Sequence, residues 1–206
     1  STLSSSSAAS DVYKRQEENM WKILGTIIGL MLVISGCAYK SQSLYFDPYI
    51  PTTHAVSSDL ALEKVYLKSV IDMRQSPQIL ATIIDSSGSA SVHATSGEAV
   101  PLWVYDALKS GLEARGIAII SNPQKDAKTL AVELEELHAK YDESILKSDN
   151  LHASMALRVQ ITKDKKTVTK NISQKSLQWH KPIKDTIAFK PILQELMQDV
   201  VERTVA

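Results

Sequence analysis

The sequence predicts a two-layer α+β fold, in which two amphipathic helices pack on one face of a mainly antiparallel sheet. Several segments alternate apolar and polar residues, as half-buried strands do. Two other segments repeat apolar residues every three or four positions, as amphipathic helices do. An element with one apolar face buries it against another layer, so we expect the helices to cover the inner face of the sheet.

The first predicted strand lies at residues 64–74, where the side chains alternate. A short apolar run at 79–84 predicts a second strand, and the Asp-Ser-Ser-Gly sequence at 85–88 is a turn signal. Residues 90–94 are a candidate third strand. The side chains expected on one face of the first strand are Val65, Leu67, Ser69, Ile71 and Met73.

Residues 98–115 carry the first helical stripe. Pro101 fits only the first turn of a helix, so the helix is expected to begin near Val100. Gly116 is a strong stop signal, because glycine readily takes the left-handed conformation just past a helix end. Residues 117–121 then predict a short strand.

Three further segments predict an antiparallel meander with one face exposed to water. Residues 129–141 alternate, but Glu135-Glu136 shifts the phase by one residue, which is typical of a β-bulge. Residues 151–161 have the cleanest alternation in the chain, and residues 167–179 form a longer, more polar strand. A charged turn joins the last two segments.

The chain ends with a second helical stripe at residues 189–205, and Pro191 suits its first turn. Its apolar positions recur three and four residues apart, so they lie on one face of the helix. This helix supplies the second member of the helical layer.

The N-terminal part predicts an export signal at residues 20–36. Lys22 supplies a positive charge before an apolar run at 23–34, and small residues follow. That run has twelve residues, whereas a membrane-spanning helix needs about twenty. Residues 1–19 are rich in serine, alanine and charge, and we exclude them as a non-native extension or assembly artefact, with Met20 as the simplest start.

The only cysteine, Cys37, ends the sequence Ile-Ser-Gly-Cys, which resembles a bacterial lipobox. The resemblance implies cleavage before Cys37, a diacylglyceryl thioether on its sulfur and an acyl chain such as palmitate on its amine. Two or three chains anchor a protein stably. A small buried thiol at the end of an uncleaved helix is the less favoured alternative. Residues 37–63 are then a lipidated N-terminus and tether, and residues 64–206 a single periplasmic domain.

The charge balance, the single cysteine and the residue after it narrow the partners, the chemistry and the location that we expect. Lys and Arg number 23, as do Asp and Glu, so the chain has no net field that would attract nucleic acid. With Cys37 acylated, no thiol remains for a disulfide, a metal site or a nucleophile. Ala38 in the second mature position favours the outer membrane, by the sorting rule of bacterial lipoproteins.

The whole arrangement resembles the YajG-like bacterial lipoproteins over roughly residues 64–205. The resemblance implies an outer-membrane lipoprotein that faces the periplasm, and the family has no established catalytic residues. It rests on Cys37, Asp72-Met73-Arg74, Ala114-Arg115-Gly116, Leu130-Ala131-Val132, the alternating run from Leu151 and the final helix.

Two pairs of residues are candidates for binding a ligand or partner. Asp72 and Arg74 lie two apart on one strand face, where they either form a solvated pair or bind a polar group. Trp103 and Trp179 either line a lipid or peptide groove between helix and sheet or are ordinary core and edge aromatics. A solvated pair is the favoured reading for Asp72 and Arg74, and ordinary core and edge aromatics are the favoured reading for Trp103 and Trp179.

His138, His152 and Glu136 are weak candidates for zinc ligands, because the predicted pairing puts all three on the water-exposed face. Exposed histidines are common on such faces, and zinc needs a third protein ligand in suitable geometry. We therefore expect no metal and no cofactor apart from the covalent lipid.

The function expected is that of a lipid-anchored outer-membrane lipoprotein with a periplasmic domain that binds another envelope protein or a cell-wall component. No catalytic motif such as Gly-x-Ser-x-Gly or a phosphate-binding glycine loop occurs, so an enzyme is not expected. The alternative is an auxiliary lipoprotein of an envelope lipid-transport system, with acyl chains or a transporter as its ligand.

Overall fold

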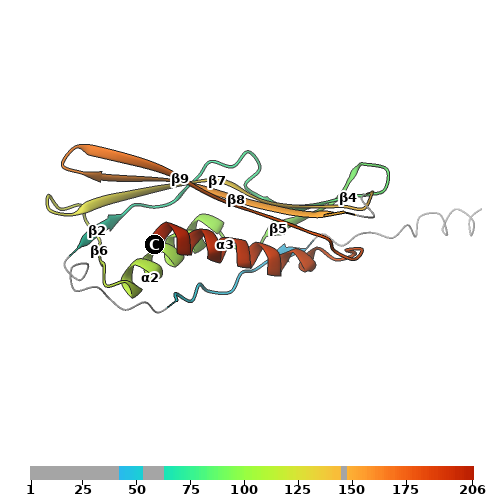
Figure 1. The fold of residues 1–206 in the computed structure, drawn as a ribbon, viewed down its shortest axis with the longest axis horizontal. Helices are drawn as coiled ribbons and strands as arrows, with labels where there is room; N and C mark the ends of the chain where they lie inside the picture. Colours follow the sequence, from blue (N-terminus) through green and yellow to red (C-terminus); the bar gives the residue numbers. More distant parts are fainter. Residues whose placement is uncertain (1–41, 53–62, 145–147) are drawn as a thin grey trace, which may run out of the picture. The chain divides into compact units, whose positions relative to one another are not determined.

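A computed structural model describes residues 42–52, 63–144 and 148–206 (Figure 1). The predicted signal segment and Cys37 lie outside the described residues, as do parts of the predicted tether. The described residues form a mixed α/β domain with one large sheet and two α-helices. No helix among them is long and apolar enough to span a bilayer.

The sheet is built around one long strand, β7 (Lys128–Asp142). Along one edge, β7 pairs antiparallel with β8 (Leu151–Lys163), which pairs antiparallel with β9 (Lys166–Gln178). Asp164 and Lys165 both have positive φ, as the tight two-residue turn between β8 and β9 requires. This three-stranded part is the meander that the alternating sequences predict.

The other edge of β7 is shared by three short strands that run parallel to it. Alternation predicts the faces of a strand but not its neighbours, so these parallel pairings could not be predicted. In chain order the short strands are β1 (Ser43–Leu44), β2 (Lys64–Leu67), β3 (Ile71–Asp72), β4 (Ile79–Ile84), β5 (Ala90–Ser96) and β6 (Ala118–Ile120). Of these, β2, β3 and β4 pair with β7, whereas β6 pairs with β2, β5 with β4, and β1 with β5.

The helices α2 (Val100–Ala114) and α3 (Lys190–Val205) lie on the same side of the sheet in Figure 1. Helix α2 begins at Val100, as Pro101 predicts, and Gly116 takes a φ of 82° just past its end. A short 3-10 helix, η2 (Thr186–Phe189), leads into α3. Side chains that are fully buried between the layers include Leu80, Leu108, Leu134, Met155, Leu157, Phe189 and Leu193.

The β-bulge predicted in β7 is present. The register against β8 shifts between Leu134 and Glu136, and Glu135 has no direct partner. Leu134 and Leu137 are both buried, so the extra residue lets the apolar face continue on the same side of the sheet.

The prediction of one continuous strand at 64–74 was wrong. The chain leaves the β-ladder after Leu67 and returns as β3 with the opposite phase, so Val70 is buried. Ile71 and Met73 were expected on the same face as Val65, but they are 53% and 59% exposed. A one-residue shift in phase exchanges the two faces of a strand. The shift between β2 and β3 therefore turns Ile71 and Met73 toward water and Val70 toward the core.

Residues 42–52 belong to the domain, which corrects the prediction of a free tether at this position. Leu44, Phe46 and Tyr49 are all buried in the core, and β1 extends the sheet beside β5. We call residues 42–52 the strap. The domain that was predicted to begin at residue 64 therefore includes the strap.

Candidate functional site

A gap in the sheet marks the most distinctive surface feature. Strand β3 pairs with residues 133–134 of β7, and β4 pairs with residues 139–142. Among the described strands, none pairs with residues 135–138 on that edge, because the chain between β3 and β4 leaves the sheet as a loop. The bulge at Glu135 falls within the gap.

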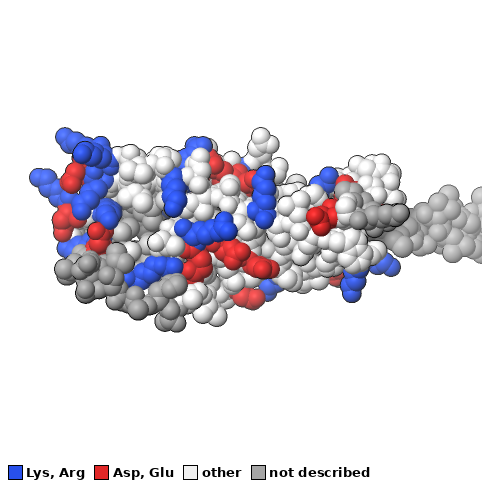
Figure 2. All heavy atoms as spheres, in the orientation of Figure 1, with Lys and Arg blue, Asp and Glu red and all other residues white. Residues whose placement is uncertain are grey.

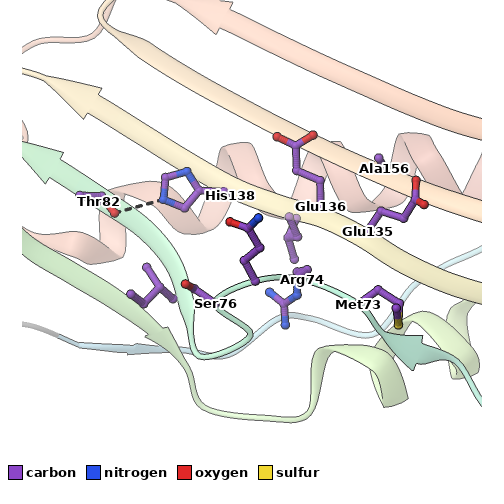
Figure 3. Close-up of a pocket in the computed structure, with 11 residues that line it drawn as sticks. Met73, Arg74, Ser76, Thr82, Glu135, Glu136, His138 and Ala156 are labelled. Atoms are coloured by element: carbon purple, nitrogen blue, oxygen red, sulfur yellow. Dashed lines mark hydrogen bonds between the residues drawn. The ribbon is translucent and has the colours of Figure 1, made fainter.

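A cavity of about 690 Å³ occupies this gap, and we call it the gap cavity. Its lining comes from the β3–β4 loop, the start of β4, the bulge of β7 and one residue of β8 (Figure 3). The lining residues include Met73, Arg74, Ser76, Thr82, Glu136 and His138. The cavity therefore combines basic, acidic and hydroxyl side chains with an unpaired strand edge.

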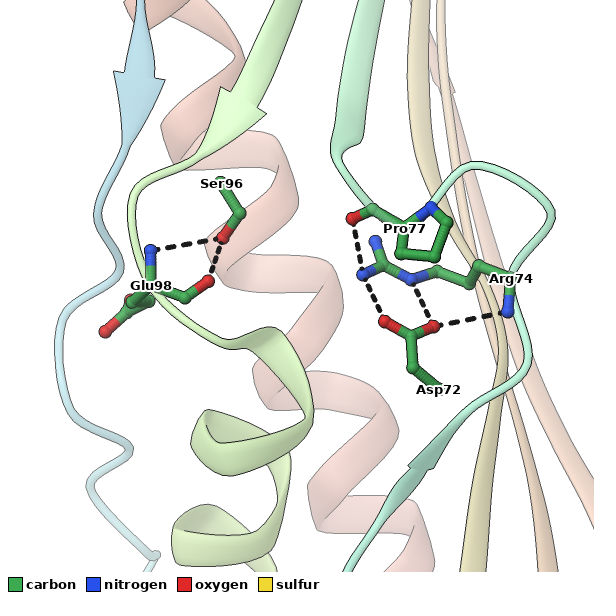
Figure 4. A network of polar contacts seen from close by, with 5 residues as sticks. All are labelled: Asp72, Arg74, Pro77, Ser96 and Glu98. Carbon is green, nitrogen blue, oxygen red and sulfur yellow. Dashed lines mark hydrogen bonds and ion pairs between the residues drawn. The ribbon is translucent and has the colours of Figure 1, made fainter.

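Arg74 is fixed by a two-point ion pair with Asp72 (Figure 4). Its Nε donates to Oδ1 of Asp72 at 2.9 Å, and its Nη2 donates to Oδ2 at 2.7 Å. Nη2 also donates to the backbone carbonyl of Pro77 at 2.8 Å. The hydrogen bonds from Arg74 hold the pKa of Asp72 below its usual value, although burial opposes this. The sequence predicted that the two residues share a face, and the structure brings them together.

The third nitrogen of the guanidinium distinguishes Arg74 from an ordinary surface pair. The Arg74 side chain is only 5% exposed, and its Nη1 has no hydrogen-bond partner among the described residues. A buried donor without a partner costs free energy, commonly about 1–3 kcal/mol. Arg74 also lines a second cavity of about 470 Å³ beside Ala99, Val100 and Pro101 at the start of α2. Arg74 therefore lines two cavities, and its Nη1 is a hydrogen-bond donor without a partner among the described residues.

His138 lies in the gap cavity, but it does not form a metal site with His152 and Glu136. Its Nε2 is 3.1 Å from the hydroxyl oxygen of Thr82, and burial lowers its pKa, which favours the neutral ring. Glu136 accepts a hydrogen bond from Ser154, and His152 Nε2 lies 3.0 Å from the carbonyl oxygen of Asp149. Within the described ranges, no three His, Cys, Asp or Glu side chains are placed to hold a metal.

The two candidate tryptophans do not share a groove. Trp103 is buried, and its indole donates to the carbonyl oxygen of Asp47 at 2.9 Å. It lines a cavity of about 240 Å³ between α2 and the strap, together with Phe46 and Tyr49. Trp179 is 59% exposed and follows the end of β9.

A polar network that sequence reasoning missed holds the strap against both helices. Glu202 of α3 accepts from the Tyr49 hydroxyl at 2.5 Å, from the Thr52 backbone at 3.0 Å and from Arg115 at 2.9 Å. Burial alone raises the pKa of Glu202, but these hydrogen bonds together lower it to about 2. Burial, followed by the hydrogen bond to Glu202, raises the pKa of Tyr49.

The gap cavity itself could not be predicted from sequence. Thr82 and Ser76 carry no recognisable motif, and they come together only because two short strands pair with one long strand at separate places. The single available signal was the phase shift at Glu135, which predicted an irregularity in β7 but not a missing neighbour.

Comparisons with known proteins agree with this fold. A family model, Lipoprotein_16, described as an uncharacterised lipoprotein, matches residues 54–206. The crystal structure of an uncharacterised protein is similar at a TM-score of 0.52 and 11% identity, covering 81% of this chain and 100% of the other. The crystal structure of protein XCC0632 from Xanthomonas campestris, of the DUF330 family, is similar at a TM-score of 0.51 and 11% identity. The match covers 81% of this chain and 88% of the other. None of the curated proteins matches.

Proposed function

Because the chain belongs to the Lipoprotein_16 family of uncharacterised bacterial lipoproteins, we propose that it is a lipid-anchored protein whose domain binds another envelope component. We further propose that it is YajG-like, that Cys37 carries the lipid, and that the anchor inserts in the outer membrane with the domain facing the periplasm. The lipobox sequence and Ala38 support these assignments. The domain acts without catalysis, cofactor or metal in this proposal.

The gap cavity is the observation that supports a binding role. It combines the free edge of residues 135–138 of β7 with a cavity of about 690 Å³. An extended segment of a partner forms backbone hydrogen bonds with such an edge. Arg74 adds a buried donor without a partner, which a carbonyl or carboxylate oxygen of the bound segment would satisfy after a small movement of the loop.

The cavity beside Trp103 gives less support to the alternative of a lipid carrier. Its volume is about 240 Å³, below the range of about 300–1,000 Å³ that is typical of small-molecule sites. The space between helices and sheet is filled by side chains such as Leu108, Leu157 and Leu193, which are fully buried. A binding site for an envelope protein therefore fits the described domain better than a groove for acyl chains.

Photo-crosslinking in living cells tests the proposal. A photoreactive amino acid at position 76, on the β3–β4 loop, is expected to give a discrete adduct with an envelope protein. The same amino acid at position 169 serves as the control, because both Ser76 and Thr169 are exposed and Thr169 lies on β9. Identical adducts from both positions, or none from position 76, would contradict a partner site at the gap cavity.

A further inference from the structure

The strap leaves very little chain between the domain and the proposed lipid anchor. Five peptide links separate Cys37 from Gln42, the first described residue. At about 3.5 Å per residue these links reach at most about 18 Å. If Cys37 carries the lipid, as the proposed function holds, the start of the strap lies close to the bilayer surface.

The start of the strap lies beside the connection between β9 and α3. Gln42 Nε2 donates to Oδ2 of Asp185 at 3.4 Å, and Ser43 of β1 is paired with Thr95 of β5. In Figure 1, β1 and the β9–α3 connection lie at the same end of the domain, and the β8–β9 turn lies at the opposite end. The connection is therefore a surface that a short anchor at Cys37 would bring close to the membrane.

The side chains that this connection exposes are of the kind found at membrane interfaces. Trp179 is 59% exposed and Ile187 is 53% exposed. Lys181 and Lys184 are exposed, and neither forms an ion pair with a described residue. Tryptophan is enriched at the headgroup level of bilayers, and lysine extends from there toward phosphate groups. At this end Figure 2 shows a few basic side chains, together with some acidic ones, on a largely uncharged surface, and a denser basic cluster lies at the opposite end.

The connection is held in place, so these side chains are presented on a fixed backbone. The buried Asn150 donates to the carbonyl oxygen of His180 at 2.8 Å and accepts from its backbone N–H at 2.7 Å. Ile183 is buried in the core, and Asp185 caps η2 by accepting from the backbone of Ile187 at 3.0 Å. A fixed backbone loses little conformational entropy when its side chains bind.

From these observations we infer that Trp179, Lys181, Lys184 and Ile187, the connection surface, dock on the phospholipid bilayer that holds the Cys37 lipid. The inference rests on the proposed lipidation. The opposite end of the sheet also exposes an apolar residue near lysines, since Val168 is 66% exposed beside Lys166 and Lys170. At about 3.3 Å per residue, Val168 lies about 35 Å along β9 from Trp179. When Trp179 is at the bilayer and β9 points away from it, Val168 does not reach the lipid.

Depth-dependent fluorescence on the lipidated full chain tests the inference. A cysteine is introduced as Ile187→Cys or, as the matched control, as Val168→Cys. Lipidation consumes the only native thiol, so a thiol-reactive NBD dye labels just the new residue. Each protein is bound to preformed vesicles of phosphatidylethanolamine and phosphatidylglycerol at a ratio of about three to one, a composition chosen because lysine favours anionic surfaces. Mass spectrometry and thiol counting establish the state of Cys37 beforehand.

Spin-labelled lipid is expected to quench the dye at position 187 at least threefold more strongly than at position 168. In the Lys181→Glu, Lys184→Glu double variant this quenching is expected to fall by about half. Equal quenching at the two positions, or stronger quenching at position 168, would overturn the inference while leaving the anchor intact. A free thiol at Cys37 would instead refute the proposed lipidation, and the inference would fail with it.

Discussion

Arg74 connects the polar chemistry of the candidate site with the packing of the domain. Its side chain is 5% exposed, while that of Asp72 is 19% exposed, so most of this ion pair is removed from water. The spacing of the two residues predicted that they share a face. It did not predict their burial, because the phase shift after Leu67 turned that face inward.

Asp72→Asn is expected to destabilise the domain by about 3 kcal/mol. The substitution leaves the buried guanidinium of Arg74 without its counter-charge, and breaking a buried pair in this way is costly. Chemical denaturation measures the change in the free energy of unfolding. Lys64→Ala is the control, because its ion pair with Asp126 is exposed to water and is expected to contribute little to stability. Equal losses in the two variants would contradict the account of Arg74.

Glu202→Gln is expected to change how the free energy of unfolding depends on pH. The folded protein lowers the pKa of Glu202 from 4.5 to about 2, so its ionised form stabilises the fold. That contribution is fully present above pH 4.5 and is lost as the pH falls from 4.5 toward 2. The free energy of unfolding of the wild type should therefore exceed that of Glu202→Gln by about 3 kcal/mol at pH 6, and the difference should nearly vanish at pH 2. A difference that is constant with pH would contradict the network around Glu202.

At the scale of elements, the strap is a structural part of the domain. Phe46→Ala is expected to lower the free energy of unfolding by about 3 kcal/mol, because it removes a buried aromatic ring from the core. Ile50→Ala, in the same segment but 82% exposed, is expected to change it by less than about 0.5 kcal/mol. If both variants kept wild-type stability in thermal and chemical unfolding, the strap would be a tether after all.

The sequence predicted elements well where one face is buried along the whole strand, as in β8. It failed at β2 and β3, because the interruption at residues 68–70 is set by where the chain meets β7 and leaves no turn signal. The strap was missed for a related reason. Its buried residues Leu44, Phe46 and Tyr49 follow no sustained period, so neither alternation nor helical spacing marks them as core residues.

For the whole molecule, the mixed sheet explains why the candidate site was predicted only in part. Asp72 and Arg74 are neighbours along the chain, so their spacing was informative. The gap cavity arises from separate pairings of β3 and β4 with β7, and alternation contains no information about such pairings. Trp103 and Trp179 were considered together because both are aromatic, but one is buried beside the strap and the other is exposed after β9.

The anchor is the central claim about the whole molecule, and fractionation of Cys37→Ser against wild type tests it most directly. The wild type is expected in the outer-membrane fraction, with a mass that begins at a lipid-modified Cys37. The Cys37→Ser variant is expected to lose both this location and the processed mass, because it lacks the sulfur that carries the lipid in the proposed function. Recovery of the variant in the outer-membrane fraction at the mature size would contradict the claim.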